Sequence, residues 1–101
     1  MICETHEFDA NLAAVCGDDA GLRSELLASF RDSLDHQVDL LGRARCDGNW
    51  MVAAERLRGL GAGFHAPVLM GLAERAIEGA PGDPAVLRSL RAVAESFAAR
   101  D

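Results

Sequence analysis

The chain has no tyrosine and few valine, isoleucine or threonine residues, which are among the residues that β-strands favour. Alanine, leucine, arginine and glutamate are abundant instead, and all four favour helices. The sequence therefore excludes a sheet-based fold and predicts an all-α protein. Its length of 101 residues, 50% of them hydrophobic, predicts one domain over residues 1–101 with a single core.

Positive charge and long apolar runs are also scarce. Ten basic and 16 acidic residues give a net charge of −6, which would repel nucleic acids and anionic membrane surfaces, so we expect neither as a partner. No apolar run approaches the roughly 20 residues that cross a bilayer. The first residues, MICETHEFD, are acidic where a signal peptide is basic, so we expect a cytoplasmic protein.

The cysteines show none of the spacings that metal sites require. Cys3, Cys16 and Cys46 lie far apart and form no C-x-x-C pair, so we expect reduced, partly buried thiols. No Ser-His-Asp or Cys-His arrangement follows from spacing either. The sequence predicts no metal site, no cofactor and no enzymatic activity.

Helix stops and caps divide the chain into one short helix and four longer ones. We expect the short helix over about residues 8–15, with Leu12 and Val15 covering one end of the core. The expected first residues or caps of the longer helices are Asp18 or Asp19, Asn49, Pro67, and Asp83 with Pro84.

The second helix should end near residue 46 and the fourth at Gly79. Short connections between the long helices predict an antiparallel up-down-up-down four-helix bundle with a short extra N-terminal helix.

Three glycines stand at alternate positions in the third helix, in the stretch AERLRGLGAGFHA over residues 54–66. A nucleotide-binding loop would need a preceding strand and the spacing G-x-G-x-x-G or G-x-x-x-x-G-K-S/T, and neither is present. Each glycine inside a helix costs about 1 kcal/mol relative to alanine, so close approach by another group should offset that cost.

The glycines fall on different faces of this helix. Gly61 shares a core stripe with Ala54, Leu57 and Phe64, which predicts close packing against another helix. Glu55, Arg58 and Gly59 share the opposite face, and a glycine there has no packing role within its own chain.

This stretch resembles the signature of histidine-phosphotransfer (HPt) domains, A-H-x-L-K-G-x-x-x-x-[FL]-G, in which an exposed histidine carries a phosphoryl group between receiver domains. Ala54, Leu57, Gly59 and Phe64 match, and Arg58 replaces the lysine. The resemblance covers nearly the whole chain: GDDAGLRSELLASFRDSL is similar to the family's long second helix, and CDGNW to the connection before its phosphorylated helix.

Two positions depart from the signature, because Glu55 occupies the histidine position and His65 the second glycine position. A phosphorelay needs an imidazole nitrogen that accepts and later releases the phosphoryl group. Glutamate is a weak nucleophile, so the resemblance implies a module that docks receiver or histidine kinase domains without carrying phosphate. The implied partner-binding residues are Met51, Val52, Glu55, Arg58, Gly59 and Ala62.

Two alternatives remain open, and a monomer is expected in each case. The protein could be an active phosphotransfer protein that uses His65 or His36. It could also be a helical interaction module without a signalling role, in which Glu55 and Gly59 are ordinary surface positions. Taken without the surrounding pattern, Glu55 and Arg58 predict an ordinary i,i+3 surface pair.

Overall fold

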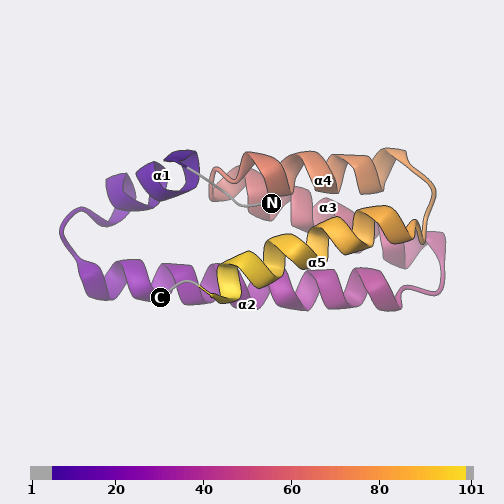
Figure 1. Cartoon of the computed structure of the whole chain (residues 1–101), viewed down its shortest axis with the longest axis horizontal. Coiled ribbons are helices and arrows are strands. Elements are labelled where there is room, and N and C mark those ends of the chain that lie inside the picture. The colour runs from indigo at the N-terminus through magenta and orange to yellow at the C-terminus, as the bar shows by residue number, and fades with distance from the viewer. Residues whose placement is uncertain (1–5, 100–101) are drawn as a thin grey trace.

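The computed structural model describes residues 6–99, and within that range it contains five α-helices and no strand (Figure 1). The helices are α1 (His6–Cys16), α2 (Ala20–Arg43), α3 (Asp47–Gly63), α4 (Pro67–Glu78) and α5 (Pro84–Ala98). The expectation of an all-α protein is confirmed. The molecule is elongated, with extents of 44 × 21 × 21 Å.

Most helix boundaries follow from local capping chemistry. The Asp19 carboxylate accepts a hydrogen bond from the backbone N–H of Leu22, and the Asp83 carboxylate accepts one from Ala85. Pro67 and Pro84 each occupy a first helical position, where the missing N–H costs nothing. These starts agree with the sequence-based predictions, and α4 ends before Gly79 as expected.

The predicted cap of α3 was wrong. Cys46, not Asn49, is the N-cap: its backbone is extended and its Sγ accepts a hydrogen bond from the Asn49 N–H at 3.4 Å. Asn49 lies inside the first turn. The second helix also ends earlier than residue 46, at Arg43, because Ala44 adopts an extended conformation.

The buried hydrophobic side chains form one core, to which all five helices contribute. Helix α2 packs against α1, α3 and α5, and α4 packs against α3 and α5. Leu12 is buried as expected, but the prediction for Val15 was wrong, because 62% of its surface is exposed. Cys16 is buried, whereas Cys46 is exposed rather than partly buried; Cys3 lies outside the described residues.

Four phenylalanine rings form one cluster within the core. Phe8, Phe30 and Phe97 pack on one another with ring centroids 4.7–4.9 Å apart, and Phe64 lies 4.8 Å from Phe30. The four rings come from α1, α2, α5 and the end of α3, so they hold these elements together through interactions worth about 0.5–1.5 kcal/mol per pair beyond burial. No helix within residues 6–99 is both long and apolar enough to span a membrane.

Candidate functional site

The residues suggested by the signature lie together on the solvent side of α3. We call this surface the α3 outer face; its members are Met51, Val52, Glu55, Arg58, Gly59 and Ala62. All are exposed except Met51, which is half-buried, and Val52 is an apolar side chain with 47% of its surface in water. Three- and four-residue spacings join them into one strip that is roughly 16 Å long.

The opposite side of α3 anchors the helix in the core. Trp50 is 2% exposed, and its indole Nε1 donates a hydrogen bond to the Ala76 carbonyl of α4 at 2.9 Å. Ala54 and Leu57 are fully buried. A Cβ on Gly61 would lie 2.9 Å from the backbone nitrogen of Met70, so the expected close packing at Gly61 is confirmed. These contacts fix which side of α3 faces the core and leave the α3 outer face toward solvent.

Gly59 differs from Gly61 in its surroundings. A Cβ built on Gly59 would meet nothing within 4 Å, so no described part of this chain requires a glycine there. Gly63 and Gly71 are open in the same way, so openness alone does not distinguish Gly59. Its position beside two exposed charged side chains, on the face opposite the core, makes it a candidate contact for a partner.

Glu55 and Arg58 are exposed, and neither forms an ion pair with another residue in the range 6–99. The i,i+3 surface pair considered as an alternative is therefore not formed. Because neither charged group has an ion-pair partner among the described residues, both can form hydrogen bonds with an incoming molecule.

His65 occupies the end of α3 and closes the helix. Its φ of 56° lies in the left-handed region, its N–H donates to the Ala62 carbonyl at 3.4 Å, and the Ala66 N–H donates to the Gly61 carbonyl at 2.8 Å. This pair of bonds is the Schellman motif, in which glycine is usual at the His65 position. His65 is thus part of the helix terminus, ten positions beyond Glu55.

His36 is exposed on α2, a different helix from the one that carries the α3 outer face. Within residues 6–99, no three His, Cys, Asp or Glu side chains converge as a metal site would require.

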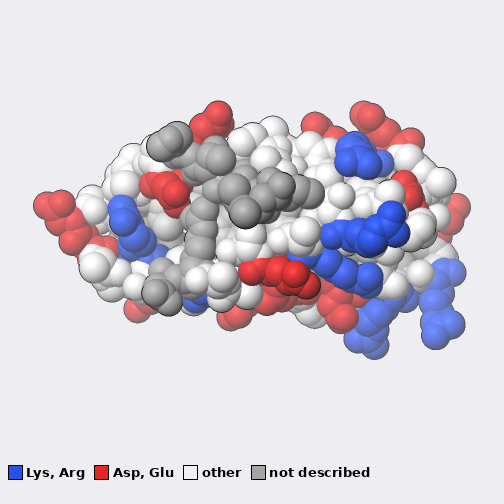
Figure 2. Space-filling view, viewed as in Figure 1, with Lys and Arg blue, Asp and Glu red and all other residues white. Residues whose placement is uncertain are grey.

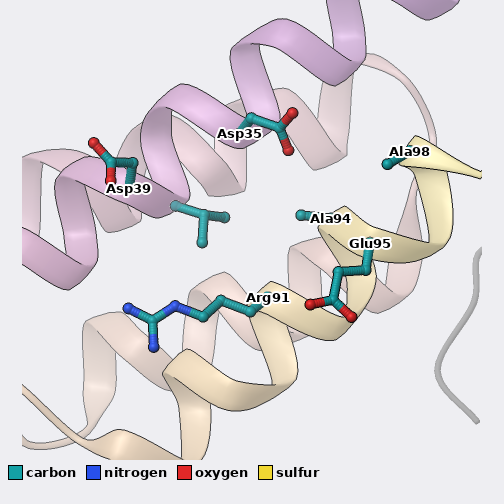
Figure 3. A pocket seen from close by; sticks show the side chains of 7 residues that line it. Asp35, Asp39, Arg91, Ala94, Glu95 and Ala98 are labelled. Atoms are coloured by element: carbon teal, nitrogen blue, oxygen red, sulfur yellow. The ribbon is translucent and has the colours of Figure 1, made fainter.

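Among the pockets that border α2 are two that a second long helix also lines, and neither was predicted from the sequence. One, of about 270 Å³, lies between α2 and α5; Figure 3 shows Asp35 and Asp39 on α2 across from Arg91 and Glu95 on α5. Its charges are of both signs, so they partly offset each other and define no ligand class. The other lies between α2 and α3 and includes Val52 of the α3 outer face.

Comparisons with protein-family models, with curated protein sequences and with solved structures found no match to this chain.

Proposed function

We propose that this protein is an HPt-like signalling module of a bacterial two-component phosphorelay, which docks a response-regulator receiver domain or a histidine kinase without carrying phosphate. The observation that carries the proposal is the open space over Gly59 beside the exposed, unpaired Glu55 and Arg58. A partner loop that approaches the helix backbone at Gly59 would offset the roughly 1 kcal/mol that this glycine costs the helix.

We infer that α2 to α5 form an antiparallel up-down-up-down four-helix bundle, with α1 as the short additional helix, in one domain over residues 1–101. The pairwise packing supports this inference, because α2 and α4 each contact both α3 and α5. This is the architecture that the resemblance implies, and it would present the middle of α3 to a partner.

The loss of phosphotransfer follows from chemistry at position 55. A phosphorelay histidine attacks an aspartyl phosphate with a neutral imidazole nitrogen, and a nearby cation offsets the charge that arrives. Arg58 supplies the cation, but the Glu55 carboxylate is a weak nucleophile and already negative. Glu55 instead imitates the charge of a phosphorylated histidine, or reaches toward the magnesium ion in the acidic pocket of a receiver.

In this proposal the protein acts by binding alone. It is a cytoplasmic, monomeric, non-enzymatic protein without a cofactor, and neither nucleic acid nor membrane is its partner. Phosphotransfer through His65 has less support, since that residue's backbone serves the helix terminus.

The decisive experiment is an NMR titration of isotope-labelled protein with receiver domains from the same genome, each with and without a phosphoryl mimic. Shifts should concentrate at Glu55, Arg58 and Gly59. Gly59→Leu should abolish them, whereas Gly71→Leu is the matched control, because both residues are open glycines inside helices. Equal binding by both variants would refute docking on the α3 outer face.

Two other outcomes would replace the proposal. Transfer of phosphate to the protein that is lost in His65→Gln or His36→Gln would identify an active phosphotransfer protein. Failure of every receiver and kinase to bind would leave a helical interaction module without a role in this signalling pathway.

A further inference from the structure

A second surface feature lies beside the α3 outer face but has a different chemistry. It is the pocket of about 380 Å³ between the last turns of α2 and the first half of α3. Its polar lining includes Arg43, Arg56 and Gln37, and no carboxylate side chain lines it. Its volume falls in the range of about 300–1,000 Å³ that is usual for small-molecule sites.

The pocket is positive in a protein that is negative overall. Most arginines on the face shown in Figure 2 gather toward the end of the molecule where α2 leads into α3. Arg56 forms no ion pair with any residue in the range 6–99. Arg43 donates to the Asp39 carboxylate at 3.2 Å, but both side chains are more than half exposed, and such surface pairs are weak.

Arg43 can therefore still donate hydrogen bonds to a ligand. A guanidinium has five N–H donors, and the Asp39 contact engages only Nη1. Arginine also binds carboxylates with two parallel hydrogen bonds, which a single lysine ammonium cannot do. Two such groups on one pocket favour an anionic ligand.

Gln37 indicates a second property of the ligand, a hydrogen-bond donor. Its side-chain Oε1 is buried and accepts no hydrogen bond from any described residue. A buried acceptor without a donor is destabilising, so a ligand whose N–H or O–H group meets Gln37 as its side chain turns toward the pocket would offset that cost. The apolar lining includes Leu40, Ala44 and Val52, which suit a hydrocarbon body between the two polar ends.

We propose that the α2–α3 pocket binds a small organic acid that also carries an N–H or O–H donor. The carboxylate lies between Arg43 and Arg56, the apolar body covers Leu40, Ala44 and Val52, and the donor bonds Gln37 Oε1. This site does not depend on receiver docking, because it lies in the cleft between two helices and shares only Val52 with the α3 outer face, not Glu55 or Gly59.

The test uses N-acetyl-L-leucine as the probe, since it combines a carboxylate, an apolar side chain and an amide N–H. Its matched control is N-acetyl-L-leucinamide, which has a neutral carboxamide in place of the carboxylate. NMR titration of the full chain should give saturable shifts at the Gln37 side-chain amide and at Val52 with the acid. The amide should give none over the same concentrations.

Three variants complete the test. Arg56→Gln should weaken binding about tenfold, the loss expected for a charge-assisted hydrogen bond. Gln37→Met should also weaken it, while Arg75→Gln, an exposed arginine on α4, should leave it unchanged. Equal affinity for acid and amide, no saturable shift with the acid, or unchanged affinity in Arg56→Gln would each overturn the proposal. No receiver is present, so failure here is separate from failure of the docking proposal.

Discussion

Gly61 of α3 lies directly against the backbone of Met70 in α4: a Cβ on Gly61 would be 2.9 Å from the Met70 amide nitrogen and 3.2 Å from the Ala66 carbonyl oxygen. Both neighbours are backbone atoms, which cannot turn aside as the end of a flexible side chain can. The spacing between α3 and α4 at this point therefore depends on the absence of a side chain.

Gly61→Ala is accordingly expected to destabilise the protein by about 1–2 kcal/mol, because the overpacking cost exceeds the gain in helix propensity. Gly59→Ala is the matched control. Nothing lies within 4 Å of a Cβ there, so it should stabilise the protein by about 1 kcal/mol. Urea unfolding followed by circular dichroism measures both. Shifts of the two midpoints in the same direction would contradict this account of α3–α4 packing.

His65→Gly is expected to raise the free energy of unfolding by about 1 kcal/mol. The φ of 56° at His65 is strained for a residue with a Cβ and relaxed for glycine, and the hydrogen bonds of the helix end use only backbone atoms. His65→Ala separates the loss of the imidazole from the relief of strain, since alanine keeps the Cβ. A denaturation midpoint that falls in His65→Gly would mean that the imidazole itself stabilises the helix end.

Glu55→His is expected to convert the α3 outer face into a phosphoryl acceptor, if the surface still docks receivers as proposed. The introduced imidazole would attack the phosphorus of an aspartyl phosphate, the aspartate would leave, and Arg58 would offset the incoming charge. The readout is a phosphoryl group on the protein that is stable in base and lost in acid.

The controls for that experiment are Glu55→Gln, which has no nucleophile, and Glu55→His combined with Gly59→Leu, which blocks the approach. A receiver that binds Glu55→His without transferring phosphate would show that docking at this surface does not bring position 55 to the aspartyl phosphate.

Helix boundaries that depend on one or two adjacent residues could be predicted from the sequence. Asp19 caps α2, and Asp83 with Pro84 starts α5, because a short carboxylate accepts a nearby N–H and proline fits the first turn wherever such a helix forms. The start of α3 was predicted wrongly because its cap is not one of the common capping residues. Cys46 is an unusual cap, and Asn49 is a common one that lies only three residues later.

The candidate site likewise has some features that the sequence could predict and others that it could not. Helical spacing alone placed Glu55, Arg58 and Gly59 opposite Ala54 and Leu57, and their exposure agrees with that prediction. Spacing could not show that Glu55 and Arg58 form no ion pair, because rotamer choice decides whether two exposed side chains meet. It also could not reveal the strain at His65, where the residue that ends α3 adopts a left-handed conformation.

The sequence by itself determined the helical class, most helix starts and the solvent side of α3, because these depend on composition, caps and a 3.6-residue period within short stretches. Tertiary structure alone decided that Trp50 bonds Ala76, that Gly61 touches Met70, and that Arg43, Arg56 and Gln37 share one pocket. Each of these is a contact between helices, and its geometry depends on how the helices pack against one another rather than on the pattern within either one.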